Sequence, residues 1–216
     1  MRRPRFIAEQ ARNAHGPLGR LLAWVMARET WRENLAAIDA LDVQPGDHVL
    51  DLGSGHGRGL AELARRAPRG RAVGADPSPL MCELAAARNR ERVQAGQVEV
   101  VLANAERLPF ADASFDKVLC VHVVYFWRDL GAALHEIARV TKPGGRLAIA
   151  ARTAENQAAV AAFPTEVYRF PTSAELHEAL LEAGFAPPER TAERDETRES
   201  VLLVAGRAAR PRLAKG

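Results

Sequence analysis

The sequence has few of the features that mark secreted, membrane-bound or metal-binding proteins. Its 216 residues include only two cysteines, Cys82 and Cys120, and both lie in apolar stretches. Two cysteines cannot build a disulfide framework and lack the spacing of a metal site, so we expect buried thiols, a cytoplasmic protein and no bound metal. No apolar run approaches the ~18–20 residues of a membrane span. The Arg-rich start is not followed by the apolar segment of a signal peptide.

Net charge is also small. The chain has 30 Lys and Arg residues against 27 Asp and Glu residues, a formal net charge of +3. Seven of the basic residues lie in the first five and last ten positions, so residues 6–206 carry a net charge of −4. A mildly acidic body with basic ends is unlike a surface that binds a phosphate backbone, so we expect no nucleic-acid partner.

The order of apolar and helical patterns predicts an α/β fold in one main domain. From residue 48 onward, short apolar runs alternate with helical segments, which is typical of a parallel sheet covered on both faces. The expected strands are 48–52, 71–75, 98–102, 117–124 and 146–151, and the expected helices are 60–67, 79–94, 130–141 and 173–183. Strand-like segments at about 188–194 and 200–206, joined by a polar turn, predict a terminal hairpin.

The segment VLDLGSGHG, residues 49–57, carries the chemistry. A strand enters a glycine-rich turn that opens a helix, so we expect backbone N–H groups to face a ligand there. The dinucleotide pattern G-x-G-x-x-G is not met, because Arg58 and Leu60 stand at the sixth positions counted from Gly53 and Gly55. The carboxylate of Asp51, at the strand end, would repel a pyrophosphate but suits a ligand with an ammonium group.

Two further strand ends carry polar residues. Asp76 ends the second strand, 21 residues beyond Gly55, where an acidic residue accepts hydrogen bonds from both hydroxyls of a ribose. Pro77 fixes the following turn, and Ser78 is a candidate helix N-cap. Asn104 follows the third strand, where an amide or a loop N–H reads an adenine edge. Together these positions predict a nucleoside ligand at the carboxyl edge of the sheet.

Residues 43–152 resemble the class I S-adenosylmethionine-dependent methyltransferases. Within them the chain is most similar to the small-molecule group of methyltransferase type 11, which includes ubiquinone and menaquinone C-methyltransferases. The segments that carry the resemblance, in order, are VLDLGSGHGRG, GADPSPLM, ANAERLPFADASFDKV and RVTKPGGRL. The resemblance implies a Rossmann-like, seven-stranded, mostly parallel sheet with an antiparallel last strand, helices on both faces and an N-terminal helical cap. It also implies S-adenosylmethionine as cofactor and S-adenosylhomocysteine as product.

The same resemblance implies where the cofactor binds. Asp51 and the glycine loop would hold the methionine part, Asp76 the ribose, and residues 104–105 would flank the adenine. The expected cofactor-binding residues are Asp51, Gly53, Ser54, Gly55, Gly57, Asp76, Pro77, Met81, Asn104, Ala105, Glu106 and Val121. His122 and Tyr125, which follow the fourth strand, are the candidate catalytic residues, because a general base is needed when the acceptor is neutral.

We expect three regions: a helical cap at 1–42, a cofactor-binding domain at 43–206 and a basic tail at 207–216. Within the cap, an apolar stripe recurs at helical spacing, and we expect it to cover the ligand site; its members are Leu18, Leu21, Leu22, Val25 and Met26. A second cap helix is expected at about 30–41. The expected function is methyl transfer to a small-molecule acceptor. A nucleic-acid or protein methyltransferase and a non-catalytic cofactor-binding protein remain open, and the sequence does not indicate the oligomeric state.

Overall fold

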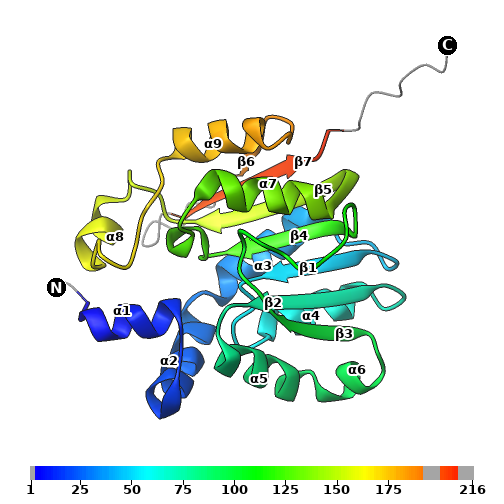
Figure 1. Ribbon diagram of the computed structural model, residues 1–216, viewed down its shortest axis with the longest axis horizontal. Helices are drawn as coiled ribbons and strands as arrows, with labels where there is room; N and C mark the ends of the chain where they lie inside the picture. The colour runs from blue at the N-terminus through cyan, green and yellow to red at the C-terminus, as the bar shows by residue number, and fades with distance from the viewer. Residues whose placement is uncertain (1–2, 192–199, 209–216) are drawn as a thin grey trace.

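The computed structural model of the protein describes residues 3–191 and 200–208. Its centre is a twisted sheet with the strand order β3-β2-β1-β4-β5-β7-β6 (Figure 1). The strands are β1 His48–Leu52, β2 Arg71–Asp76, β3 Val98–Leu102, β4 Phe115–Val121, β5 Thr141–Ala151, β6 Glu189–Thr191 and β7 Val201–Gly206. The five strands β1 to β5 are parallel, while β7 runs antiparallel to β5 and β6 antiparallel to β7. The expected mostly parallel fold is confirmed, with six strands of at least five residues and the three-residue β6.

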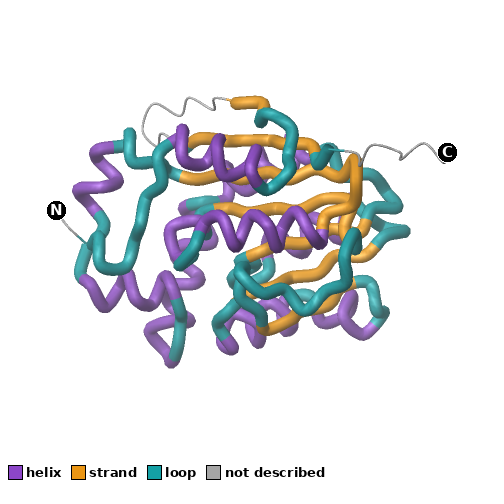
Figure 2. The backbone as a smooth tube through the Cα atoms, turned by 45° about the horizontal axis from the view of Figure 1, so that its top comes forward, coloured by secondary structure: helices purple, strands orange, loops and turns teal. Residues whose placement is uncertain are grey.

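Helices cover both faces of this sheet (Figures 1 and 2). They are α1 Arg5–Arg12, α2 Gly16–Glu29, α3 Trp31–Leu41, α4 Arg58–Arg66, α5 Pro79–Arg88, α6 Arg90–Gln94, α7 Leu130–Val140, α8 Gln157–Ala162 and α9 Ser173–Glu182, with a 3₁₀ turn η1 at Val124–Phe126. One core cluster joins α7 and α9 to the sheet, for example through Leu134 and Leu180. The other joins α3 and α4 to it, for example through Ile38 and Leu63. The sheet is thus buried on both sides, as its apolar strands require.

Several element boundaries differ from the expectation. The expected helix 79–94 divides at Asn89, because its side chain donates both to the carbonyl of Gly57, at 3.0 Å, and to that of Ala85, at 2.9 Å. The expected strand 117–124 instead ends at Val121, and η1 follows. β5 begins at Thr141, directly after α7, and the link after it contains the unexpected helix α8. The terminal hairpin is confirmed through β6 and β7, although its predicted turn, 195–197, lies outside the described residues.

The helix α3 belongs to the sheet's own core and not to a separate cap. Ala37, Ile38 and Leu41 are fully buried in the cluster that includes Leu119 of β4 and Ala148 of β5. The predicted boundary at residue 42 therefore separates α3 from the sheet on which it packs. The helices α1 and α2 lie beside the carboxyl ends of the parallel strands (Figure 1), and α1 joins the first core cluster through Ala8.

Three members of the predicted apolar stripe of α2 face outward instead of covering the site, and the side chain of Met26 lies outside what the structure describes. Leu18, Leu21 and Val25 are 41%, 58% and 36% exposed. The helix is instead held at its start, where Gly19 approaches both the Gln10 side chain and Leu80. The expectation failed because amphipathic spacing shows that a helix has an apolar face but not which surface that face meets.

Candidate cofactor and acceptor site

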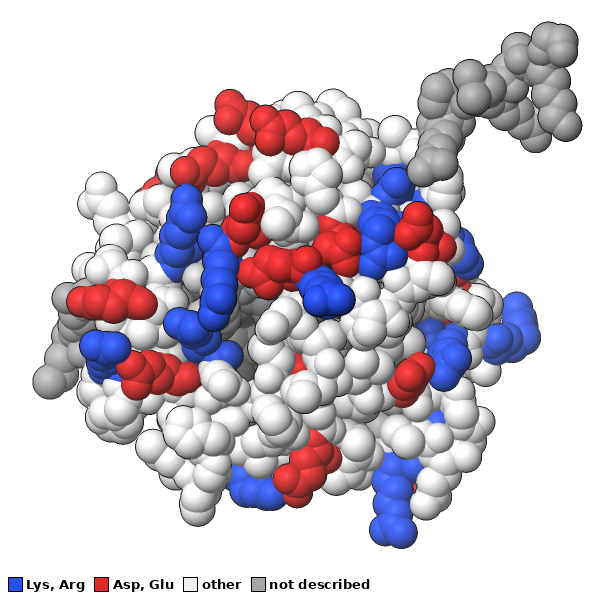
Figure 3. All heavy atoms as spheres, viewed as in Figure 1, with Lys and Arg blue, Asp and Glu red and all other residues white. Residues whose placement is uncertain are grey.

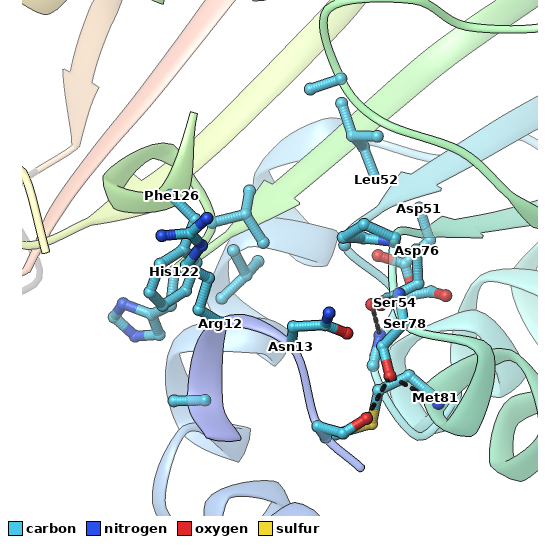
Figure 4. Close-up of a pocket in the computed structure, with 18 of the residues that line it drawn as sticks. Arg12, Asn13, Asp51, Leu52, Ser54, Asp76, Ser78, Met81, His122 and Phe126 are labelled. Atoms are coloured by element: carbon cyan, nitrogen blue, oxygen red, sulfur yellow. Dashed lines mark hydrogen bonds between the residues drawn. The ribbon is translucent and has the colours of Figure 1, made fainter. Parts of the chain in front are cut away.

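The carboxyl ends of β1, β2 and β4 open into a cavity of about 660 Å³ (Figure 4). The glycine loop after β1, the turn after β2, the segment 103–107 and the residues after β4 form much of its wall. The segment 11–14 and the first turn of α3 complete it. This is the edge of a doubly wound sheet at which ligands bind.

Three glycines shape the loop after β1. Gly53, Gly55 and Gly57 have φ values of +75°, +52° and +80°, a region that residues with a side chain rarely adopt. A Cβ atom on Gly53 would lie 2.1 Å from Cγ1 of Val123, and one on Gly57 would lie 2.7 Å from the backbone of Ala85. A Cβ atom on Gly55 would meet no atom of the described residues within 4 Å. Gly55 is therefore where the loop borders open space.

The N–H groups of Gly53 and Gly55 are bonded to β2, contrary to the expectation that the loop N–H groups face a ligand. Gly53 N donates to the carbonyl of Ala75 at 2.7 Å, and Gly55 N donates to Oδ2 of Asp76 at 2.9 Å. Ser78 N donates to Oδ1 of the same carboxylate at 2.9 Å. A ligand hydroxyl at Asp76 must therefore use the lone pairs that remain on two already bonded oxygens.

Asp51 and Asp76 place two carboxylates close together at the ends of neighbouring strands (Figure 4). They are only 5% and 7% exposed, yet both line the cavity. Burial, followed by the charge of Asp76, raises the pKa of Asp51 to about 7, although the N–H of Leu60 opposes the shift. Burial also raises the pKa of Asp76. A positively charged ligand would relieve this repulsion, so the pair favours a cation.

Ser78 connects the N-terminal segment to this edge of the sheet. Its Oγ donates to the carbonyl of Ala14 at 2.7 Å and accepts from N of Met81 at 3.3 Å. The predicted N-cap is thus confirmed, and the same hydroxyl holds the segment 11–14 against the start of α5. On the other side of that segment, the ring of Trp31 lines the cavity and lies 3.8 Å from the guanidinium carbon of Arg58.

His122 is held at both ring nitrogens. Its Nε2 lies 2.5 Å from Oε2 of Glu33, and its Nδ1 lies 2.8 Å from the hydroxyl of Tyr125. That hydroxyl also accepts from N of Arg152 at 2.6 Å. Nε2 of His122 donates to Glu33, because an ionised carboxylate can only accept, and the hydroxyl of Tyr125 pairs with Nδ1. Ser200 Oγ donates to the other oxygen of Glu33 at 2.7 Å.

This network bears on the predicted catalytic pair. His122 lines the cavity, whereas Tyr125 is not among its lining residues; the Tyr125 ring packs against Phe126 and Phe170. Burial raises the pKa of Tyr125 above its ordinary value. Burial raises the pKa of Glu33, but hydrogen bonds from His122 and Ser200 outweigh it and bring the value to about 2. A proton-accepting role for His122 stays a prediction, and it requires one of these two hydrogen bonds to break.

A family model described as a methyltransferase domain matches residues 50–149. The chain is 39% identical over 165 residues to the O-methyltransferase resE of Aspergillus sclerotiorum, covering 73% of this chain and 62% of that protein. It is 39% identical over 116 residues to the ubiquinone/menaquinone biosynthesis C-methyltransferase UbiE of Pseudomonas putida, covering 52% and 44%. Residues 50–149 are therefore similar to a methyltransferase domain.

Solved structures share the fold of this chain. One is the putative methyltransferase in complex with the Haloferax volcanii activator Trm112, with a TM-score of 0.72, 24% identity and coverage of 88% of this chain and 94% of that one. A second is an S-adenosylmethionine-dependent methyltransferase from Aquifex aeolicus, with a TM-score of 0.67, 22% identity and coverage of 81% and 89%. The chain spans at most 62% of the length of the two curated relatives named above.

The residues at the sheet edge fit S-adenosylmethionine, the cofactor that the resemblance implies. S-adenosylmethionine carries a sulfonium and an ammonium, and the paired carboxylates of Asp51 and Asp76 supply the negative charge that such a ligand needs. Gly55 leaves the loop open to it. Every expected cofactor-binding residue except Gly57 lines the cavity. Gly57 instead packs on α5 and begins α4, where its carbonyl accepts from Asn89.

Some residues that line the cavity were not predicted from the sequence. Arg12 and Asn13 reach it from the end of α1, and Trp31 and Asn34 reach it from α3. Glu33 contacts His122 across 89 positions of sequence, and no local pattern marks such a pair. Within residues 3–191 and 200–208, no three potential ligands are grouped as a metal site. In the same residues, no helix is long and apolar enough to cross a bilayer.

Proposed function

We propose that the protein transfers a methyl group from S-adenosylmethionine to a small-molecule acceptor. The observation that carries this proposal is one cavity with two chemically different halves (Figure 4). The cofactor half holds Asp51, Ser54, Asp76, Ser78 and Met81. The acceptor half holds Arg12, His122 and Phe126 (Figure 4), and the next wall residues along the chain, Trp127 and Arg128, extend it toward Glu106. One half thus offers negative charge, and the other offers aromatic surface and positive charge.

In this function, the bound cofactor supplies an electrophilic methyl group. The chain contributes alignment of the acceptor and exclusion of water, which are the main requirements of a displacement reaction. Within the cofactor half, we propose that Asp51 binds the ammonium group and Asp76 the ribose, and that residues 104–106 flank the adenine with Met81. Val121 and the glycine loop lie between the halves. We propose that the segment 11–14 is the element that shields the cavity from solvent.

The partners and location follow the same reasoning. The charge of residues 6–206 supports a small acceptor over nucleic acid, and relatives named for O- and C-methyl transfer support oxygen or carbon as the accepting atom. Cys82 and Cys120 are both free thiols, which supports a cytoplasmic location. A nucleic-acid or protein substrate remains the alternative, as does binding of the cofactor without catalysis.

A labelled-cofactor screen tests the proposal. The protein is incubated with S-adenosylmethionine carrying a deuterated methyl group and with a metabolite extract, and products are found by mass spectrometry. Labelled small molecules that are absent with Asp51→Ala, and present with Asp39→Ala on the outer face of α3, would support it. Label only in protein or nucleic acid would replace the proposal with the alternative substrate class. Cofactor binding without any labelled product would reduce it to a binding function.

A further inference from the structure

The charges of the acceptor half are unbalanced. Arg12 and Arg128 both line it, and neither guanidinium has a hydrogen bond or ion pair with any part of the chain that the structure describes. Figure 3 shows Lys and Arg side chains gathered left of centre, over the region of Figure 1 where β4 ends and α7 begins. Unpaired guanidinium groups at a cavity wall are suited to a carboxylate or another ionised oxygen.

The nearest carboxylates do not neutralise these two arginines. Glu33 accepts from His122 and from Ser200, one at each oxygen. Glu106 accepts from the backbone N of Arg128, at 2.8 Å, and not from its side chain. Asp51 and Asp76 lie on the far side of Asn13 from Arg12 (Figure 4). The acceptor half therefore presents positive charge to whatever enters it.

Among the residues that the structure describes, the acceptor half has no side chain free to take up a proton. Both nitrogens of His122 are engaged, and the hydroxyl of Tyr125 is bonded both to His122 and to the backbone N of Arg152. A neutral alcohol or amine acceptor would need a base that this arrangement does not offer. An acceptor that arrives ionised needs none.

We infer that the acceptor is a planar organic acid whose oxygen is already ionised at neutral pH, either a carboxylate or an acidic phenol or enol. This inference rests on the proposed function. Arg12 and Arg128 bind the anion, and its ring lies against Phe126 and Trp127, which are partly buried at the same wall. Aromatic side chains next to guanidinium groups are suited to flat anionic molecules.

The reaction of such an acceptor balances without a base. The ionised oxygen attacks the methyl carbon, so an O–C bond forms while the bond from that carbon to sulfur breaks and its electron pair passes to sulfur. A neutral ester or ether and S-adenosylhomocysteine result, and no proton is moved. The product has lost the charge that Arg12 and Arg128 bind, so it is released more readily than the acceptor.

Binding of a matched set of probes tests this inference. The protein saturated with S-adenosylhomocysteine is titrated calorimetrically with 2-naphthoate, 2-naphthylmethanol and methyl 2-naphthoate at pH 7.5. These three share one ring system and differ in charge. We expect 2-naphthoate to bind about tenfold more tightly than either neutral probe, because each hydrogen bond to a charged group is worth about one factor of ten.

Three variants assign that preference to the two arginines. Arg12→Gln and Arg128→Gln should each weaken the binding of 2-naphthoate by about three- to tenfold. The affinities for S-adenosylhomocysteine and for 2-naphthylmethanol should stay unchanged. Arg5→Gln is the matched control, because Arg5 lies on the same helix as Arg12 but pairs with Glu9 outside the cavity. It should leave the preference for the acid intact.

The outcomes separate this inference from the function on which it rests. Failure of S-adenosylhomocysteine to bind would overturn the proposed function. S-adenosylhomocysteine could bind while 2-naphthoate binds no more tightly than the neutral probes, or while no probe binds at all. Either result would refute the anionic acceptor and leave the proposed function standing. A preference that Arg5→Gln weakens as much as Arg12→Gln and Arg128→Gln do would also refute the anionic acceptor, because net charge alone would then explain the effect.

Discussion

Replacing Asp51 with asparagine should stabilise the ligand-free protein, although it removes a residue of the site. Asp51 is 5% exposed, and burial together with the charge of Asp76 raises its pKa from 3.8 to about 7. Between these two values the unfolded chain has lost the proton while the folded chain retains it. Stability therefore falls as pH rises through this window and is level above it. Asparagine has the same shape and keeps an oxygen for the N–H of Leu60.

The size of the effect follows from the shift. Because the pKa of Asp51 is raised by about three units, the folded protein is about 4 kcal/mol less stable when Asp51 is ionised than it would be with an unshifted carboxylate. The cost develops at about 1.4 kcal/mol for each pH unit, so between pH 5 and pH 7 it grows by about 2–3 kcal/mol. The advantage of Asp51→Asn over the natural protein should grow by up to that amount over this range and stay constant from pH 7 to pH 8.

Urea unfolding followed by circular dichroism at pH 5, 6, 7 and 8 measures this difference directly. Asp116→Asn is the control, because Lys142 and the N–H of His48 outweigh partial burial and lower the pKa of Asp116. The difference in unfolding free energy between Asp116→Asn and the natural protein should be constant across the same pH range. Asp116 is ionised there in both the folded and the unfolded chain. A difference for Asp51→Asn that is independent of pH, or that shrinks as pH rises, would refute the assignment of a buried, strained carboxylate.

Three further predictions concern the cofactor half and the cap. Asp76→Ala should lower the affinity for S-adenosylhomocysteine, measured by calorimetry, at least tenfold, and Asp76→Asn should lower it less. Unchanged affinity in a folded variant would contradict the role of Asp76. Gly53→Ala should lower the melting temperature more than Gly55→Ala, because only the first Cβ meets a neighbour, Cγ1 of Val123 at 2.1 Å; Gly55→Ala should cost about 1–2 kcal/mol from its positive φ alone, and equal losses would contradict the loop geometry. Hydrogen exchange at residues 10–28 should slow when S-adenosylhomocysteine is added, and equally slow exchange without ligand would make this segment a fixed part of the core.

The parts of the structure that depend on local pattern could be predicted from the sequence. β1 and β3 begin and end at the expected residues because apolar runs are bounded by turns. The positions of Asp51 and Asp76 followed from the same pattern, since carboxyl ends of parallel strands meet at one edge. The glycine register also excluded a pyrophosphate-binding loop.

The remaining features depend on contacts between distant segments. Asn89, at which the predicted helix divides, donates to the carbonyl of Gly57, 32 positions away. His122 adopts a φ of +56° and is held by Glu33, whose position is set by the packing of α3 on the sheet. Several N–H groups of the glycine loop bond to β2, which no reading of the loop by itself indicates. The helical spacing of apolar residues in α2 predicted an apolar stripe, but it did not predict that members of this stripe are exposed to solvent.

The central claim is that the carboxyl edge of the sheet binds S-adenosylmethionine through Asp51 and Asp76. Calorimetric titration of the full chain with S-adenosylhomocysteine and, separately, with NAD tests it most directly, because both ligands contain adenosine but only one carries the pyrophosphate. The account predicts one site for S-adenosylhomocysteine, weakened by Asp76→Ala, and no measurable binding of NAD. Binding of NAD that is tighter than that of S-adenosylhomocysteine would contradict it.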